Sequence, residues 1–401
     1  MRIPPDIIVI LAGISAALHI GKLPPAIPVL EQAMGLDLVT GGFLLSMVML
    51  AGVTLGILVG TTAESLGLRR ALLSGLVLLG VGSLLGGVAN QPGLLLWTRA
   101  LEGLGFLLVV LPAPGLVRRL VPPELLTRRL GLWSCYMGLG VGVALLVGPL
   151  WLDFLGWRSW WWLLGGISLL LAGAVWHRVP VTDYHTQPTS EGHQAWGARI
   201  GRTLTRPGPW LVAMTFSLYS GQWIAVVGFL PTLYGDAGFG LGLIGVMTAL
   251  VALINILGNL AAGQCLHRGI RAHHLLWTGF VAMGVGAWLS FGLLQPGWGQ
   301  FAAVLMFSAV GGLIPGAMFY LAVRVSPDEQ SISSTIGWMQ QWSSLGQFVG
   351  PPLVAVVASQ VGGWQWTWGV TGSMAVGGLV LSALLARHQA RLQAAGEPQS
   401  P

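Results

Sequence analysis

Charged residues are scarce in this chain. Lys, Arg, Asp and Glu together account for 8% of its 401 residues, whereas about a quarter of a soluble globular protein is charged. Hydrophobic residues make up 54%, and the mean hydropathy is +0.76. This composition excludes an ordinary soluble domain and predicts a protein that crosses a membrane many times.

Cysteine and the motifs of enzymes are also nearly absent. The chain has two cysteines, Cys135 and Cys265, which form no pairing pattern. It contains no HExxH zinc motif, no paired acidic residues within the apolar runs and no glycine-rich ATP-binding loop. The segment GISA (13–16) matches a serine-nucleophile motif poorly. We therefore expect no enzyme, no catalytic residue, no metal site and no cofactor.

Long apolar runs recur from one end of the chain to the other. A helix needs about 20 apolar residues to cross the hydrocarbon core, and continuous runs of that length favour helices over barrel strands. The predicted spans are residues 7–30, 38–59, 71–89, 94–117, 130–150, 160–176, 209–231, 243–264, 274–294, 299–322, 334–357 and 365–386. The predicted fold class is an all-α membrane protein with twelve transmembrane helices.

Basic residues indicate the orientation of these spans. Lys22 is the single lysine, and the other 18 of the 19 cationic side chains are arginines. With the N-terminus inside, nearly all of them fall in cytoplasmic loops, as the positive-inside rule requires. The net charge of +6 thus reflects topology and needs no nucleic-acid partner. We expect both termini in the cytoplasm and a location in a bacterial inner membrane.

The chain contains an internal duplication. A shift of 203 positions brings Pro28 onto Pro231, Gly60 onto Gly263 and Pro112 onto Pro315. Six spans in each half make the two copies parallel, an arrangement found in two-bundle secondary transporters. The predicted divisions are a first bundle at 1–176, a cytoplasmic linker at 177–208, a second bundle at 209–388 and a cytoplasmic tail at 389–401.

Prolines occur at matching places in the two halves. Pro112 and Pro315 are expected to interrupt spans four and ten, and Pro149 and Pro351 to interrupt spans five and eleven. Proline removes a helix hydrogen bond and permits a bend. Although membrane helices tolerate proline for other reasons, the pairing favours hinges that let the two bundles rock.

Three short motifs resemble the major facilitator superfamily. They are the loop GTTAESLGLRR (60–70), the segment RALEGLG (99–105) and the element GPL (148–150). The segment 323–353 looks most like the cyanate and 2-nitroimidazole transporter-like branch. The resemblance implies two parallel six-helix bundles, a proton-linked arginine at Arg99 and a cytoplasmic gate formed by Gly60, Glu64, Gly67, Arg69 and Arg70.

Ionisable residues inside the predicted spans form a small set. They are His19 and Lys22 in span one, and Arg99 and Glu102 in span four. Lys22 and Glu102 both lie about 12 Å below the outer boundary, at 1.5 Å per residue. The duplication gives uncharged residues at all four equivalent positions, so the set is not a repeated structural feature. We expect these side chains to meet and to bind substrate or couple it to protons, because buried charges are costly and usually functional.

Two simpler interpretations of this set stay open. Arg99 and Glu102 are three residues apart on one helix and can pair with each other for structural reasons. Lys22 can extend outward to the membrane interface.

The second half offers amides and indoles in place of charges. The residues expected to line the substrate site there are Gln222, Trp223, Asn255, Trp338, Gln340 and Gln341. Each amide can also serve only to join helices. Cations on one wall and amides on the other suit a small polar anion or zwitterion.

The sequence thus predicts a monomeric, proton-coupled secondary transporter in contact with the lipid bilayer. Import and export are both open, and the alternatives within the superfamily are a drug or metabolite exporter and a copper importer. Copper import would use methionine and histidine ligands, yet no M-x3-M or H-x3-M pair occurs. A membrane receptor or scaffold is the alternative outside transport.

Overall fold

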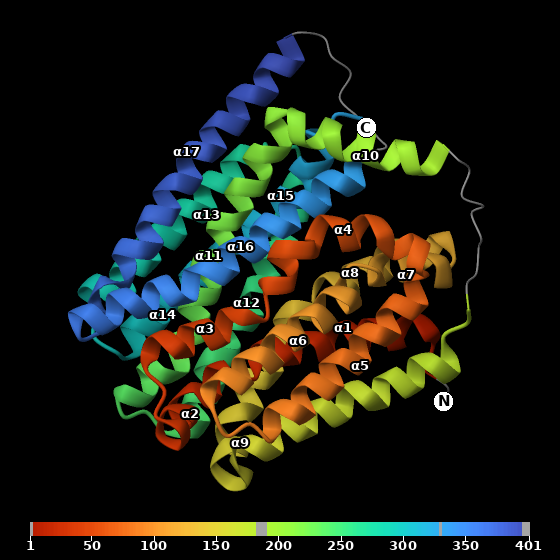
Figure 1. The fold of residues 1–401 in the computed structure, drawn as a ribbon. Coiled ribbons are helices and arrows are strands. Elements are labelled where there is room, and N and C mark those ends of the chain that lie inside the picture. The colour runs from red at the N-terminus through yellow and green to blue at the C-terminus, as the bar shows by residue number, and fades with distance from the viewer. Residues whose placement is uncertain (1–2, 182–190, 329–330, 395–401) are drawn as a thin grey trace. The chain divides into compact units, whose positions relative to one another are not determined.

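A computed structural model describes the backbone of residues 3–181, 191–328 and 331–394, and within these ranges it contains helices and no strands. The side chains of residues 60–66, 127, 191–196 and 392–394 are not described. The helices are α1 (Pro5–Gly21), α2 (Ile27–Met34), α3 (Leu38–Met47), α4 (Leu50–Leu66), α5 (Leu68–Gly87), α6 (Pro92–Val110), α7 (Ala113–Leu120), α8 (Pro123–Ser134), α9 (Tyr136–Arg178), α10 (Glu191–Thr205), α11 (Pro207–Asp236), α12 (Leu241–His267), α13 (Ala272–Ala287), α14 (Trp298–Gly311), α15 (Leu313–Arg324), α16 (Ile332–Val361) and α17 (Thr367–Ala394) (Figure 1). Short 3₁₀-helical turns at Pro24–Ala26 and Trp364–Trp366 and a π-helical segment at Trp288–Leu293 connect some of them.

The twelve predicted spans are present. Among the described residues, 11 helical stretches are long and apolar enough to cross a membrane. One of them, Pro123–Arg178, has 56 residues and contains a break at Gly156, where φ is 76° and ψ is 164°. A residue with a side chain rarely adopts this backbone conformation. The chain turns back there (Figure 1), so this stretch holds two spans and the fold class is confirmed.

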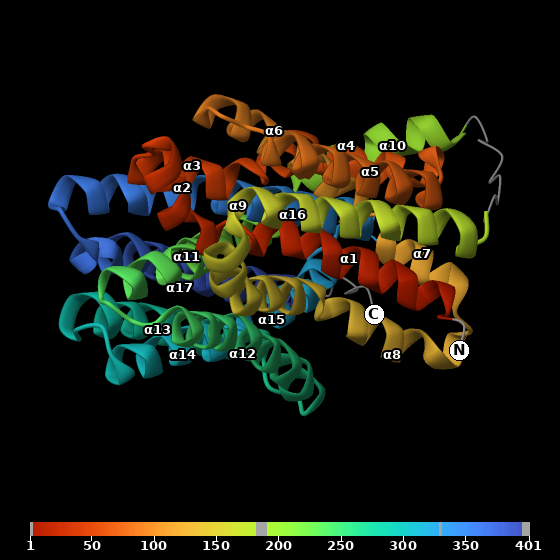
Figure 2. The same cartoon turned by 90° about the horizontal axis from the view of Figure 1, so that it is seen from below.

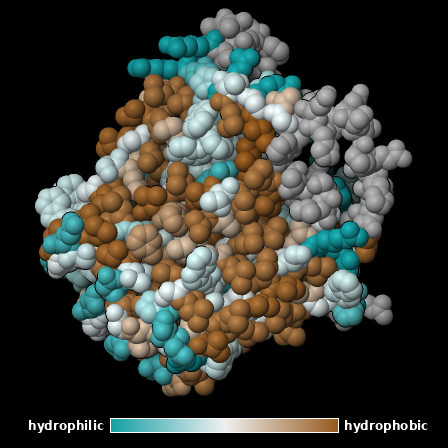
Figure 3. Space-filling model, viewed as in Figure 1, coloured by the Kyte–Doolittle hydropathy of each residue, from teal (hydrophilic) through white to brown (hydrophobic). Residues whose placement is uncertain are grey.

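Hydrophobic side chains face outward along these helices. Trp97, Phe154 and Leu170 expose 77%, 79% and 76% of their surface. Figure 3 shows hydrophobic residues over most of the face in view, with hydrophilic ones gathered toward its ends. A soluble protein seldom exposes so continuous an apolar surface. The chain is therefore an integral membrane protein.

Contacts divide the chain into two compact units. The first comprises Met1–Thr54, Leu58–Tyr184 and Val226–Leu253, and the second comprises Leu55–Ile57, His185–Ala225 and Ile254–Pro401. This division by contacts does not test the bundle boundaries inferred from the duplication, which stay a prediction.

In the first unit, α1 packs against α9, and α5 packs against both α6 and α9. Figures 1 and 2 both show α1, α5 and α9 running alongside one another. The α5–α6 contact depends on glycine: a Cβ at Gly75 would lie 2.7 Å from the carbonyl oxygen of Gly105. Small residues let membrane helices approach closely, and this contact brings α5 and α6 together around the candidate site.

In the second unit, α13 packs against α14, α15 and α17. Glycine again permits a close approach, this time between α11 and α16, where a Cβ at Gly221 would lie 2.7 Å from the carbonyl oxygen of Gly346. Within the predicted linker the structure has a helix, α10, that the composition of this segment did not indicate.

The two proline pairs behave differently. Span four breaks between α6 and α7 at Pro112, and span ten breaks between α14 and α15 at Gly312, three residues before Pro315. The interruptions expected at Pro149 and Pro351 were wrong, because α9 and α16 continue through these residues. Neighbouring helices can hold a membrane helix in shape across a proline. The hinge role of all four prolines stays a prediction.

Candidate functional site

Two helices of the first unit supply the charged residues. His19 occupies the last turn of α1, and Lys22 is its C-cap residue, after which the Pro24–Ala26 turn ends the helix. Arg99 and Glu102 lie one turn apart on α6. All four side chains have 0% exposure. We call these four residues the charged cluster.

Glu102 lies at the centre of the charged cluster. Its Oε1 accepts a hydrogen bond from Lys22 Nζ, and its Oε2 accepts one from Arg99 NH1 at 2.5 Å. His19 Nδ1 is 3.6 Å from Oε1. Both oxygens of the carboxylate are therefore held by cations, each from a different helix.

Lys22 points into the bundle and does not extend to the membrane interface. Besides Glu102, its ammonium group donates to Ser83 Oγ at 2.9 Å and to His19 Nδ1 at 3.4 Å. It also lies 4.7 Å from the centre of the Trp161 ring, where a cation is attracted by the aromatic face. Three acceptors match the three protons of the ammonium group.

His19 extends the cluster toward α9. Its Nε2 lies 2.8 Å from Ser168 Oγ, which in turn lies 2.9 Å from Ser15 Oγ. Because Nδ1 accepts from Lys22, these contacts fit a neutral imidazole whose proton is on Nε2 and is donated to Ser168. The serine pair fixes which ring nitrogen faces the charges.

Arg99 holds three helices together and keeps one donor group unused. Its NH1 also donates to the carbonyl oxygen of His19 at 2.7 Å, and its Nε donates to the carbonyl oxygen of Leu44 in α3 at 3.3 Å. Its buried NH2 group has no hydrogen-bond partner among the described residues. A buried guanidinium nitrogen left without a partner is costly, and its N–H groups can donate to an additional anionic or polar ligand.

The electrostatic balance of the cluster is positive. A lysine and an arginine face one carboxylate, and the imidazole fits the neutral form. The Arg99–Glu102 pair that the sequence offered as a structural alternative is present. It engages only one of the two carboxylate oxygens of Glu102, and Lys22 engages the other. Because burial weakens solvent screening, removing one member leaves a strongly unfavourable charge on the others.

The residues predicted in the second half are only partly gathered, and all belong to the second unit. Gln222 is fully buried, and neither its amide oxygen nor its nitrogen has a partner among the described residues. Trp223 Nε1 instead donates to Ser308 Oγ at 3.0 Å, and Asn255 Nδ2 donates to the carbonyl oxygen of Ser308 at 2.8 Å. Gln222 therefore keeps its hydrogen-bonding capacity, whereas the other two join α11 and α12 to α14.

The remaining predictions in this unit fall on α16. Trp338 packs edge-on against Trp210 at 4.9 Å and against Trp342 at 6.0 Å between ring centres. Gln340 and Gln341 are both half-buried. This helix thus presents an aromatic group and two adjacent amides, and their role in binding stays a prediction.

The predicted cytoplasmic gate is partly visible. Gly67 caps α5 with a φ of 85°, and Arg69 NH2 donates to the carbonyl oxygen of Trp176 at 2.7 Å. This bond ties the start of α5 to the end of α9, and Arg70 is exposed. The surroundings of Gly60 and the side chain of Glu64 lie outside the described part of the structure, so the gate stays a prediction.

Sequence reasoning missed the uncharged members of the site. Ser15, Ser83 and Ser168 are buried and hydrogen-bonded to the charged cluster or to each other. Serine is common in membrane helices, where it bonds to its own backbone. A serine within an apolar run therefore carries no signal until the neighbouring helices are placed.

Comparisons with known proteins agree on the family. The family profile of the Major Facilitator Superfamily matches residues 7–330. The cyanate transport protein CynX of Escherichia coli (strain K12) is 22% identical over 393 residues, covering 94% of this chain and 95% of that protein. The cephamycin export protein CmcT of Amycolatopsis lactamdurans is 25% identical over 342 residues, covering 76% of this chain and 67% of that protein. The puromycin resistance protein pur8 of Streptomyces alboniger is 30% identical over 146 residues, 36% of this chain and 29% of that protein.

Solved structures share the fold. A bacterial homologue of the human lysosomal transporter Spinster, in an inward-facing and occupied conformation, has a TM-score of 0.76 and 14% identity, with 96% of each chain covered. The family profile covers well over half of the chain and agrees with the motifs, the twelve spans and the fold. The chain belongs to the Major Facilitator Superfamily of membrane transporters.

Proposed function

We propose that this protein is a proton-coupled secondary transporter that moves a small polar anion or zwitterion across a bacterial inner membrane by alternating access. The observation that carries the proposal is the charged cluster, in which Glu102 is held between Lys22 and Arg99 with no exposure to solvent. Charges buried at such depth are expensive and usually functional.

The coupling follows from charge balance. With Glu102 ionised, its two oxygens occupy Lys22 and Arg99. An anionic solute that contacts these cations competes with Glu102, and the displaced carboxylate is then stabilised by taking up a proton. Binding of solute and proton at the cluster therefore favour each other, which is the thermodynamic requirement for cotransport. The unused NH2 group of Arg99 supports a place for the solute.

The second unit offers a polar group of its own to a solute. Among the described residues, neither the amide nitrogen nor the amide oxygen of the buried Gln222 side chain has a hydrogen-bond partner, which suits a solute with both a donor and an acceptor. Such a side chain gains more from a bound polar ligand than one already engaged in structural hydrogen bonds. Gln222 is therefore the member of the second-half set that we assign most directly to the solute.

The comparison with CynX supports a small anion. Cyanate is a small anion, and that transport protein matches nearly the whole chain. The proposed orientation has both termini in the cytoplasm, as the distribution of the arginines indicates. The proposed working unit is a monomer.

Export of a drug or metabolite is the second candidate. It is favoured by the similarity to the cephamycin export protein, which covers 76% of this chain, and by the GPL element at 148–150. The two candidates differ in direction and in solute size, so one experiment can separate them.

Purified protein in sealed liposomes tests the proposal. We expect an inward proton gradient to drive accumulation of a small anion such as cyanate, acetate or nitrate, and a protonophore to abolish it. Glu102→Gln should lose gradient-driven accumulation and keep exchange of labelled solute across the membrane, since its amide cannot release a proton. Glu124→Gln is the control because Glu124 is an exposed acid of the same unit.

Two results would contradict the proposal. Accumulation by Glu102→Gln that equals the wild type would remove the coupling role from this residue. Proton-driven movement of bulky drugs with no movement of small anions would favour the export candidate.

A further inference from the structure

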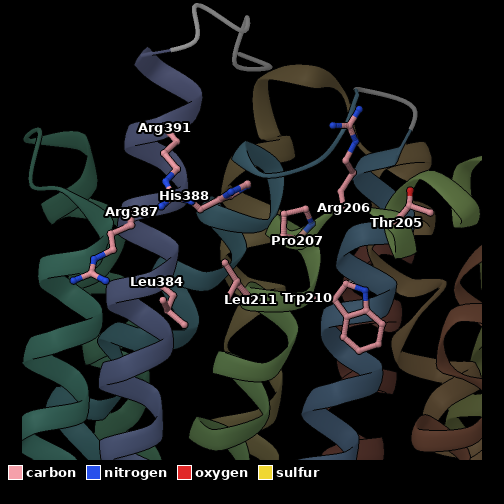
Figure 4. Close-up of a pocket in the computed structure, with 9 residues that line it drawn as sticks. All are labelled: Thr205, Arg206, Pro207, Trp210, Leu211, Leu384, Arg387, His388 and Arg391. Atoms are coloured by element: carbon pink, nitrogen blue, oxygen red, sulfur yellow. The ribbon is translucent and has the colours of Figure 1, made fainter.

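A basic pocket lies in the second unit, whereas the charged cluster belongs to the first. It has a volume of about 520 Å³ and is lined by Thr205, Arg206, Pro207, Trp210, Leu211, Leu384, Arg387, His388 and Arg391. Figure 4 shows α17 residues on one side and residues from the end of α10 and the start of α11 on the other. Nearly 180 positions of sequence separate the two walls.

Both walls change from apolar to basic in the same direction. On α17 the order is Leu384, then Arg387, then Arg391 toward the end of the helix. On α11 the order runs from Leu211 back to Arg206 just before the helix begins. The apolar residues fall inside the predicted spans, and the arginines fall just beyond them. The pocket is thus amphipathic along the membrane normal.

The charge of the pocket is not neutralised by its own lining. Three arginines and no carboxylate are among the described residues that line it. Within the described part of the chain, none of these three arginines forms an ion pair with an acid. In Figure 4 the guanidinium groups of Arg206 and Arg387 point to different sides, so the positive charge is spread around the rim. A ligand with anionic oxygens at its head and an apolar remainder fits this distribution.

The floor of the pocket suits hydrocarbon. Leu384 exposes 42% of its surface, and Trp210 uses its indole N–H to donate to the carbonyl oxygen of Leu204 at 2.9 Å. The Trp210 ring therefore presents an apolar face with its polar group already satisfied. An indole in this position is typical of the membrane interface.

We propose that this pocket binds the headgroup of an anionic phospholipid from the cytoplasmic leaflet, with Arg206, Arg387 and Arg391 contacting phosphate and Leu384 contacting acyl chain. Basic pockets at the cytoplasmic ends of transmembrane helices bind such headgroups, and arginine suits phosphate because it can donate two hydrogen bonds at once. The spread of the three arginines favours a headgroup with two phosphates, such as cardiolipin, over one with a single phosphate.

A bound lipid would also brace the linker helix. Thr205 ends α10 and lines the pocket, and α10 is held to α16 by the Thr203–Ser334 hydroxyl pair at 2.6 Å and to Asp328 by Arg202 at 3.3 Å. A headgroup at Arg206 therefore lies where α10, α11 and α17 converge. This inference rests on the proposed orientation of the chain in the membrane and does not depend on the proposed transport mechanism.

Native mass spectrometry of the purified protein tests the proposal. We expect one or a few molecules of cardiolipin to be retained more strongly than phosphatidylglycerol, and both more strongly than phosphatidylcholine. Changing Arg206, Arg387 and Arg391 together to Gln should weaken cardiolipin binding about a hundredfold, at about a fivefold loss for each arginine near the membrane surface.

Two matched variants make the result specific. Changing Arg118, Arg268 and Arg271 to Gln removes the same charge from exposed positions outside the pocket and should change binding less than threefold. Changing the three pocket arginines to Lys keeps the charge and should cost less than tenfold. If the Gln variant does not fold, the Lys variant tests the proposal alone. Equal binding of phosphatidylcholine and cardiolipin by the Lys variant would overturn the proposal.

Other outcomes would overturn it as well. Equal losses in the pocket variant and the control variant would mean that only overall charge matters. Displacement of cardiolipin by glycerol phosphate or inorganic phosphate at equal concentration would assign the pocket to a soluble anion, because the apolar floor would then contribute nothing.

Discussion

Replacing Glu102 with glutamine removes the carboxylate that both Lys22 and Arg99 contact. All three side chains have 0% exposure, so in Glu102→Gln two cations stay buried without their counter-charge. Breaking a buried ion pair by removing one partner costs about 3–5 kcal/mol. We expect the free energy of unfolding of Glu102→Gln to fall by about this amount, measured by denaturant titration in detergent micelles.

A second substitution should recover part of this loss. Lys22→Met keeps most of the side-chain volume and removes one of the two stranded cations. In the double variant, Arg99 alone lacks a counter-charge, so we expect the double variant to be more stable than Glu102→Gln. The coupling energy in this double-mutant cycle should be about 1–3 kcal/mol.

Two results would refute this reasoning. Glu102→Gln with unchanged stability would mean that the buried cations are already neutral or hydrated. Additive losses in the double variant would mean that Lys22 and Glu102 do not interact. Lys22→Met alone should be less destabilised than Glu102→Gln, because Arg99 still neutralises the carboxylate.

Three further predictions concern other parts of the protein. Ser168→Ala should lower the free energy of unfolding by about 1–3 kcal/mol, since His19 Nε2 and Ser15 lose a buried partner; Ser382→Ala, whose hydroxyl bonds to its own helix at Gly378, should cost less. Gly75→Val should prevent close packing of α5 on α6, because the new Cβ would lie 2.7 Å from a carbonyl oxygen. We therefore expect Gly75→Val to express poorly or to elute abnormally in size-exclusion chromatography. Gly166→Val, which has open space around the new side chain, should express and elute normally. Hydrogen bonds from the hydroxyl and then the amide N–H of Thr40 hold the pKa of Asp37 below its usual range. The ionised Asp37 carboxylate therefore stabilises the start of α3 at neutral pH. This stabilisation is lost as the pH falls through the lowered pKa. Asp37→Asn should therefore show a smaller drop in thermal midpoint between pH 7 and pH 3 than the wild type.

Much of the charged cluster was predictable. Counting residues at 1.5 Å each placed Lys22 and Glu102 at one depth, and the duplication showed that the second half has no equivalent charges. The count could not give the direction of the lysine side chain. That direction depends on Ser83 and Trp161, which α5 and α9 bring to the same place.

The hydrogen bonds of the second-half residues could not be predicted from the sequence, for a physical reason. Gln222, Trp223 and Asn255 look alike as polar groups within apolar runs. Only the packing of α14 satisfies Trp223 and Asn255 through Ser308 and leaves Gln222 unsatisfied. A hydrogen bond depends on the neighbour across the interface, and the sequence of one helix does not identify that neighbour.

The sequence by itself determined the twelve spans, their predicted orientation and the family. It could do so because a hydrocarbon core demands long apolar helices with their backbone bonds satisfied internally, and this demand is local to each segment. The tertiary structure decided which buried groups meet, that α9 and α16 continue through Pro149 and Pro351, and that Arg206 and the arginines of α17 line one pocket. These outcomes depend on contacts between residues far apart in the chain, where close packing selects one arrangement among many with the same composition.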